Sequence, residues 1–121
     1  LEAVGEVGWV EDESLMDAVT AVSGSGPAYI FLLAEAMEAA ALAQGLPPEL
    51  AGRLARATVS GAGELLRLSP EPAAQLRKNV TSPGGTTAAA LSVLMADERG
   101  MPSLMIEAIA AATRRGRELA G

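Results

Sequence analysis

The feature of this sequence that most constrains its fold is a run of residues, 28–44, that is apolar on nearly every side of a helix. Its polar positions are Tyr29, Glu35, Glu38 and Gln44. Such a helix needs neighbours around most of its circumference, and a chain of 121 residues has the length of a single domain. The run is too short, and its two acids too costly, for a membrane span. We therefore expect a second subunit, rather than a membrane, to cover part of this helix.

The composition favours helices over strands. The chain contains 25 Ala and 16 Leu, against 17 Val, Ile and Thr residues together. Ala and Leu lose little entropy in helices, whereas β-branched residues prefer strands. Ala and Gly account for 38 residues and only three residues are aromatic, so the core must pack by close approach of backbones. We expect an all-α fold of about six helices.

Caps and helix breakers divide the chain. The pattern predicts helices over about 13–22, 28–44, 48–68, 72–79, 86–97 and 103–119. We expect Ser25 to cap the second helix, with Pro27 in its first turn, and Gly45 to follow its last turn. Residues 1–10 are expected to form an extended tail or edge strand that pairs with something upstream. Because the first residue is Leu1 rather than Met, we expect the natural chain to start earlier.

The residues that are absent exclude several kinds of chemistry. The chain has no Cys and no His, which excludes disulfides, thiolate catalysis, a Ser–His triad and His- or Cys-ligated metal sites. We expect no metal. We find no basic n-region, no cleavage site and no long uncharged apolar run, so we expect a soluble cytoplasmic protein.

The charge is unevenly distributed. The net charge is −6, with nine acids and no base in residues 1–52, and with nine bases and six acids in residues 53–121. An acidic chain with so few aromatic residues is a poor nucleic-acid binder. The more basic half is where an anionic small ligand is expected to bind, although the two halves could equally face each other within or between subunits.

The glycine-rich residues 24–29, Gly-Ser-Gly-Pro-Ala-Tyr, do not match a dinucleotide-binding loop. They follow a helix rather than a strand, lack the third glycine, and place Pro27 where a phosphate needs an N–H. We interpret them as a corner between two helices.

A second glycine-containing segment, residues 79–87, is a better candidate for a ligand site. It reads Asn-Val-Thr-Ser-Pro-Gly-Gly-Thr-Thr and leads into a predicted helix. Free N–H groups and the positive end of the helix dipole favour a carboxylate or phosphate there, and Ser82, Thr86 and Thr87 can add hydroxyl donors. An ordinary capped helix start after a Pro-Gly turn has the same pattern, so both interpretations stay open.

The remaining ionisable residues are expected to have structural roles. Glu35 and Glu38 lie three residues apart and are expected to form a solvent-facing strip. Glu49 and Arg53 are expected to form a helix pair worth about 0.2–0.5 kcal/mol. Lys78, the only lysine, could approach an anionic ligand or cofactor, but we favour a surface position for it.

Two motifs resemble the C-terminal domain of pyrroline-5-carboxylate reductases. The first is residues 17–29, Asp-Ala-Val-Thr-Ala-Val-Ser-Gly-Ser-Gly-Pro-Ala-Tyr, followed by Gly-Leu-Pro at residues 45–47. The second is residues 76–87, Leu-Arg-Lys-Asn-Val-Thr-Ser-Pro-Gly-Gly-Thr-Thr, which is similar to the family signature around the substrate loop. The resemblance covers about residues 10–121, because it also reaches Arg114 and residues 117–119.

The resemblance implies a fold, a domain arrangement and a reaction. The fold is a 6-phosphogluconate-dehydrogenase-C-terminal-like domain that forms an interleaved helical dimer, with dimers in some cases assembled into rings. Residues 11–121 would be this dimerisation domain, and residues 1–10 would be a tail or strand left from a preceding Rossmann domain. The whole enzyme would reduce 1-pyrroline-5-carboxylate to L-proline with NADPH or NADH, and this chain alone would be inactive.

The resemblance also assigns residues to the site. Ser82, Gly84, Gly85, Thr86 and Thr87 fall on the substrate loop, and Thr87 matches the threonine near the imine nitrogen. Asn79 and Val80 match positions near the nicotinamide.

Two other interpretations of the function remain. The chain could be the helical domain of a related NAD(P)-dependent oxidoreductase that acts on a different small acid, or a helical dimerisation module without catalysis. The sequence upstream of Leu1 would distinguish the reductase from the module, because a strand followed by Gly-x-Gly-x-x-Gly indicates a nucleotide-binding domain.

Overall fold

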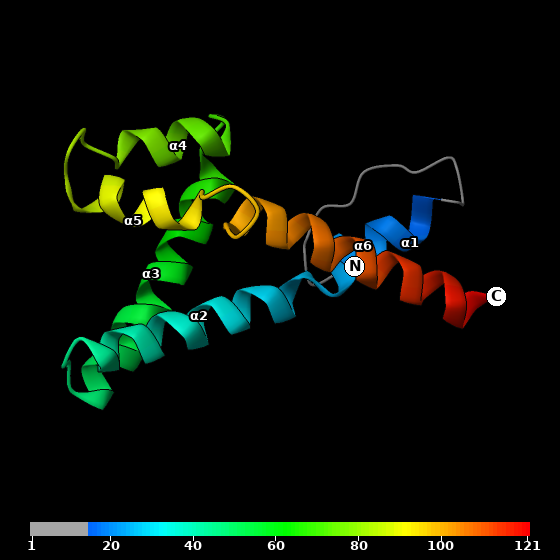
Figure 1. Ribbon diagram of the computed structural model, residues 1–121, viewed down its shortest axis with the longest axis horizontal. Helices are drawn as coiled ribbons and strands as arrows, with labels where there is room; N and C mark the ends of the chain where they lie inside the picture. The colour runs from blue at the N-terminus through cyan, green and yellow to red at the C-terminus, as the bar shows by residue number, and fades with distance from the viewer. Residues whose placement is uncertain (1–14) are drawn as a thin grey trace. The chain divides into compact units, whose positions relative to one another are not determined.

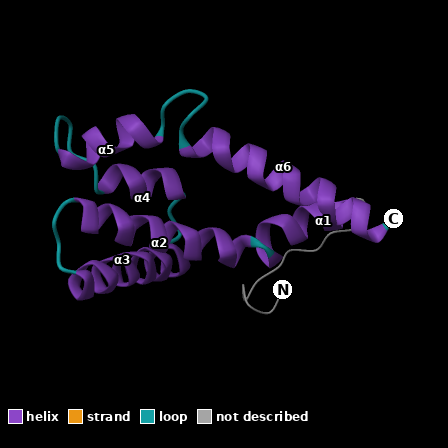
Figure 2. Ribbon diagram, turned by 60° about the horizontal axis from the view of Figure 1, so that its bottom comes forward, coloured by secondary structure: helices purple, strands orange, loops and turns teal. Residues whose placement is uncertain are grey.

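The computed structural model describes residues 15–121, and every regular element in this range is helical (Figures 1 and 2). Six α-helices and one π-helical segment, η3, are present, so the prediction of an all-α chain with about six helices is confirmed. The tail over residues 1–10 and the start of the first predicted helix lie outside the described residues. The described residues divide into two compact units, one of residues 15–27 with 86–121 and one of residues 28–85.

The first unit is built on α6 (Met101–Ala120), which packs against α1 (Met16–Val19) and η3 (Thr20–Gly24). In Figure 1, α1 lies alongside the C-terminal half of α6. The Asp17 side chain lies over Gly116, because a Cβ on Gly116 would be 3.1 Å from Asp17 Oδ1. Ala21 and Thr113 are the buried side chains of η3 and α6. The buried residues of this contact are small, as the Ala- and Gly-rich composition predicts.

The segment before Pro27 continues the helix rather than interrupting it. The Ser25 N–H donates to the Thr20 carbonyl at 3.0 Å, one residue further back than in an α-helix. Ser25 has helical backbone angles, φ −84° and ψ −19°, whereas an N-cap residue has extended ones. The prediction that Ser25 caps the next helix is therefore wrong. Pro27 has no N–H to donate to the Ser23 carbonyl, and a π-turn just before it keeps the path helical.

The turn between α5 (Thr86–Leu94) and α6 is longer than the sequence predicted, because it spans residues 95–100 rather than 98–102. We expected the first of these helices to end near residue 97 and the second to begin near residue 103. Instead, α5 ends at Leu94 and α6 begins at Met101. The Gly100 N–H donates to the Ala96 carbonyl at 2.9 Å, and Glu98 has a positive φ of 66°. Helix α5 thus ends about one turn earlier than expected, and the left-handed residue Glu98 lies within the longer turn.

The second unit contains most of α2 (Gly26–Ala43), together with α3 (Pro48–Leu68) and α4 (Ala73–Asn79). The turn from α2 to α3 is a Schellman motif: the Leu46 N–H donates to the Ala41 carbonyl at 3.2 Å, and the Gly45 N–H donates to the Leu42 carbonyl at 2.9 Å. Gly45 has φ +95°, which confirms its predicted place after the last turn.

Helix α3 begins with Pro48 in its first turn and ends at Leu68, as predicted. Its buried residues are Ala51 and Ala55, both small. A Cβ on Gly52 would lie 3.3 Å from Glu38 Oε2. The glutamate of α2 is therefore seated over a glycine of α3.

Large apolar side chains are exposed in both units. No large side chain in the described residues is fully buried, and α2 has no buried residue. Phe31 and Leu32 of α2 are 71% and 64% exposed. By length and composition alone the helical run Met16–Ala43, with a mean hydropathy of 1.3, could cross a membrane. A helix from the core of a soluble protein passes the same test, so this finding by itself assigns no membrane location.

Candidate functional site

The segment that the sequence singled out begins at the C-terminal end of α4, and its first residues are held by backbone and hydroxyl hydrogen bonds. The Arg77 carbonyl accepts both the Val80 N–H, at 3.3 Å, and the Thr81 hydroxyl, at 2.6 Å. The Thr81 N–H donates to the Lys78 carbonyl at 3.1 Å. The Thr81 hydroxyl thus acts as a side-chain cap on the last turn of α4.

Residues 82–85 form a turn whose shape depends on glycine. The Gly85 N–H donates to the Ser82 carbonyl at 3.0 Å, and Gly84 has φ +74°. Pro at the second position and a residue with positive φ at the third are the requirements of a type II turn, and Pro83-Gly84 meets both. A Cβ on Gly85 would lie only 3.3 Å from the Ser82 carbonyl oxygen. The structure therefore confirms the predicted Pro-Gly turn.

Thr86 and Thr87 follow this turn directly and are the first two residues of α5. The N–H groups of a first helical turn have no partner within their own helix. The hydroxyl groups of Ser82, Thr86 and Thr87 form no hydrogen bond to another described residue. Residues 82–87 thus contain unbonded donors in the pattern that suits a small carboxylate.

Asn79 and Val80 lie on the other side of Thr81, at the end of α4. Both are exposed, and the Val80 side chain is 66% accessible. The Asn79 Oδ1 accepts a hydrogen bond of 2.9 Å from Gln75 Nε2, one turn earlier in α4. An exposed apolar side chain thus stands beside an oriented carboxamide, which sequence reasoning did not predict.

The ion pairs differ from the expected ones. Within residues 15–121 the ion pairs are Glu64–Arg67 at 2.8 Å and Arg115–Glu118 at 3.0 Å, so the predicted pair between Glu49 and Arg53 does not form. The hydrogen bond from Arg67 lowers the pKa of Glu64 and raises that of Arg67, against weak opposing effects of desolvation. Both pairs are exposed, and pairs of this kind contribute little to stability.

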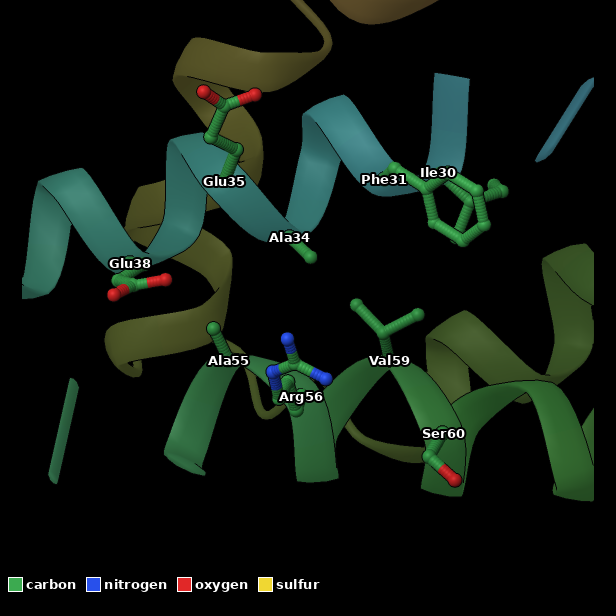
Figure 3. Close-up of a pocket in the computed structure, with 9 residues that line it drawn as sticks. All are labelled: Ile30, Phe31, Ala34, Glu35, Glu38, Ala55, Arg56, Val59 and Ser60. Carbon is green, nitrogen blue, oxygen red and sulfur yellow. The ribbon is translucent and has the colours of Figure 1, made fainter. Parts of the chain in front are cut away.

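A groove of about 590 Å³ between α2 and α3 was missed by sequence reasoning. Figure 3 shows Ala34 from α2, with Arg56 and Val59 from α3, pointing into it. It is lined by Ile30, Phe31, Ala34, Glu35, Glu38, Ala55, Arg56, Val59 and Ser60. Glu38 is half-buried over Gly52, whereas Glu35 is exposed, so the predicted solvent-facing position holds for Glu35 and is wrong for Glu38. The spacing of residues along one helix shows which of them share a face, but it does not show which other helix lies opposite that face. The groove could therefore not be predicted from the sequence.

The described residues show no group of His, Cys, Asp and Glu side chains that could hold a metal ion. The chemistry available in residues 79–87 is therefore that of amides, hydroxyls and backbone N–H groups. These groups bind and orient a ligand, and a hydroxyl can donate a hydrogen bond to a reacting nitrogen.

Residues 13–119 match the family model described as pyrroline-5-carboxylate reductase dimerisation. Among curated proteins, the chain is 50% identical to the pyrroline-5-carboxylate reductase of Synechocystis over 97% of its own length, and 48% identical to that of Pseudomonas aeruginosa over 99%. In each case it covers 43% of the relative. The chain thus spans less than half the length of these relatives.

Solved structures show the same similarity. A pyrroline-5-carboxylate reductase from Coxiella burnetii superposes with a TM-score of 0.88 and 45% identity, over 97% of this chain and 43% of the other. The Plasmodium falciparum pyrroline carboxylate reductase, solved with NADP bound, gives a TM-score of 0.82 and 34% identity over 91% of this chain and 41% of the other. With its helical fold and a family match over nearly its whole length, the chain belongs to the family of pyrroline-5-carboxylate reductase dimerisation domains.

Proposed function

We propose that this chain is the C-terminal dimerisation and substrate-binding domain of a pyrroline-5-carboxylate reductase. Residues 11–121 form this domain, and residues 1–10 lead from a preceding Rossmann domain. The whole enzyme reduces 1-pyrroline-5-carboxylate to L-proline with NADPH or NADH, in the cytoplasm. The observation that carries the proposal is the type II turn over residues 82–85, which is followed at once by a helix start with unbonded hydroxyls.

The substrate is a small cyclic imine with a carboxylate, and the segment offers a partner for each group. The backbone N–H groups of Thr86 and Thr87, with the Ser82 hydroxyl, bind the carboxylate at the positive end of the α5 dipole. The Thr87 hydroxyl donates a hydrogen bond to the imine nitrogen. Reduction adds a hydride to the C=N carbon and a proton to the nitrogen, so the nitrogen becomes a better acceptor as the reaction proceeds. A hydrogen bond that strengthens in this way accelerates the chemical step.

The end of α4 fits a nicotinamide. The apolar, 66% exposed Val80 side chain provides a surface for a flat ring, and the Asn79 carboxamide provides a hydrogen-bonding group beside it. When bound, NADPH or NADH supplies the hydride. The chain's own residues orient the ring and the imine, and the choice between the two nucleotides belongs to the Rossmann domain.

The groove between α2 and α3 and the exposed apolar side chains of α2 are proposed as dimer contacts. Phe31 lines the groove and is 71% exposed, which is unusual for a large aromatic side chain in a monomer. A Cβ on Gly63 of α3, one turn beyond Val59, would meet nothing within 4 Å, so a partner helix can approach α3 closely there. The homodimer could assemble further into a ring.

The reaction is tested by joining this chain to the nucleotide-binding half of the Pseudomonas aeruginosa relative, which gives a chimeric reductase. We expect NADPH-dependent reduction of pyrroline-5-carboxylate by the chimera and no reduction by the 121-residue chain alone. A chimera that folds, dimerises and binds NADPH but does not reduce this substrate contradicts the proposed reaction. Reduction by the isolated chain contradicts the proposed division of labour between the domains.

The dimer is tested on the chain itself by sedimentation. We expect a dimer at micromolar concentration, and a shift toward monomer in Phe31→Glu. Glu64→Gln, an exposed change on α3 outside the groove, is the control and should leave the dimer intact. A stable wild-type monomer contradicts the proposed interface.

A further inference from the structure

Gln75 is bonded to a residue of the proposed site although no interpretation of the sequence gave it a role. Gln75 and Asn79 lie one turn apart on α4, and Gln75 Nε2 donates to Asn79 Oδ1 at 2.9 Å. Both side chains are exposed. An exposed pair of this kind adds little to the stability of a folded domain. Its main consequence is the orientation of the Asn79 carboxamide.

A carboxamide has one acceptor oxygen and one donor nitrogen, and they point in different directions from the same carbon. With Oδ1 facing Gln75, Nδ2 faces away from it and remains available to a ligand. The neighbouring side chains do not compete: the Thr81 hydroxyl is bonded to the Arg77 carbonyl, and neither Arg77 nor Lys78 is bonded to Asn79. Among the described residues, Gln75 therefore decides which end of the amide a ligand meets.

We propose that Gln75 is a positioning residue for the cofactor: it holds the Asn79 carboxamide so that Nδ2 donates to an oxygen acceptor of the nicotinamide nucleoside. This inference rests on the proposed function, because it takes Asn79 to lie beside the nicotinamide. It goes further in stating which atom of Asn79 makes the contact and which residue selects it.

The test uses replacements of similar length that differ in hydrogen bonding. Gln75→Lys can only donate and keeps Oδ1 facing residue 75. Gln75→Glu, when ionised, can only accept and turns the amide round, so that the cofactor meets an oxygen. Gln75→Met does neither and leaves the amide free to rotate. The measurement is the Kd of the chimeric reductase for NADPH, obtained by fluorescence titration without substrate.

We expect the Kd for NADPH to rise by about tenfold in Gln75→Glu, by about threefold in Gln75→Met, and by less than about twofold in Gln75→Lys. The rise is largest in Gln75→Glu because the reversed Asn79 amide loses its hydrogen bond to the cofactor and places its own oxygen against the oxygen acceptor of the cofactor. The KM for pyrroline-5-carboxylate and the melting temperature should not change. Equal values of Kd in the three variants, or a rise confined to Gln75→Lys, would overturn the inference.

Charge must be separated from orientation, because a carboxylate near an anionic nucleotide also weakens binding. The same three variants are therefore made together with Asn79→Ala. If Gln75 acts through Asn79, their differences in Kd disappear in this background. If the differences persist, the effect is simple charge and the inference is wrong.

Asn79→Ala alone separates this inference from the wider proposal. We expect it to raise the Kd for NADPH by about tenfold, like Gln75→Glu. An unchanged Kd removes Asn79 from the cofactor site and overturns the role of Gln75. The reductase proposal is judged by the activity of the chimera, whatever Asn79 does.

Discussion

Two glycines, Gly100 and Gly84, stand in turns before helices, and they are required for different reasons. Gly100 has ordinary extended angles, φ −81° and ψ 173°, but a Cβ there would collide with the backbone of Leu94 and Ala96. Gly84 has open space around its Cα, but its φ is +74°. The first glycine is required by neighbouring atoms and the second by its own backbone conformation.

The difference follows from what each turn does. Gly100 is the buried residue of its turn, and it connects α5 to α6 while lying against the backbone of Leu94 and Ala96. The turn at Gly84 is exposed, ends with Gly85 and leads into the two threonines of the proposed site. Tight packing explains the one glycine, and a left-handed backbone conformation explains the other. Substitutions in the two turns can separate these two roles.

The largest effect is expected at Gly100. Gly100→Ala forces a methyl group into backbone atoms that cannot move aside, so we expect a loss of about 3 kcal/mol or more in the free energy of unfolding. Urea denaturation of the 121-residue chain measures it. Gly61→Ala, in the interior of α3 where a Cβ meets nothing within 4 Å, is the control and should not destabilise the chain. Equal stabilities of the two variants would show that the turn at Gly100 is not tightly packed.

The next effect is kinetic and concerns Thr87, beyond the exposed turn. Thr87→Ala removes the proposed hydrogen bond to the imine nitrogen, so kcat of the chimeric reductase should fall about 10–100-fold, equivalent to about 1–3 kcal/mol. KM should rise less than kcat falls. Thr87→Ser keeps the hydroxyl and should recover most of the rate. If Thr87 only caps α5, the melting temperature will drop and kcat/KM will stay unchanged.

Gly84→Ala should have a smaller effect on stability than Gly100→Ala. A left-handed φ costs a non-glycine residue about 1–2 kcal/mol, and no neighbouring atom adds to this cost. Because the strained turn precedes the carboxylate site, the KM for pyrroline-5-carboxylate should also rise. Gly84→Asn should be milder, since Asn tolerates this conformation better. Comparable losses in the two variants would indicate that space, not φ, limits this position.

The smallest effect is expected at Glu98, which has the backbone conformation of Gly84 but lies in the turn of Gly100. Its φ is 66°, without the freedom of a glycine. Glu98→Gly removes this strain but makes the unfolded chain more flexible. We therefore expect the free energy of unfolding to increase by up to about 1 kcal/mol. Thermal denaturation measures it, with Glu98→Gln as the control for loss of charge. A lower melting temperature in Glu98→Gly than in Glu98→Gln would contradict the inference that the backbone of Glu98 is strained.

Local signals in the sequence were sufficient for much of the fold. The start of α3 near Pro48 and the place of Gly45 after the last turn of α2 depend on residues a few positions apart, and both were predicted. The end of α5 and the start of α6 were not predicted, because they depend on how Gly100 packs against Leu94 and Ala96. The cap expected at Ser25 also failed, since a π-turn competes with a cap before a proline.

By itself the sequence determined that the chain is helical, that it carries a Pro-Gly turn before a pair of threonines, and that it resembles pyrroline-5-carboxylate reductases. These properties follow from composition, from residues near one another in the chain, and from the order of its motifs. Only the tertiary structure decided that Glu38 and Arg56 line one groove, that Asp17 lies over Gly116, and that Gln75 orients Asn79. Contacts between helices and the rotation of a side chain depend on which atoms meet in space, and spacing along a sequence does not specify them.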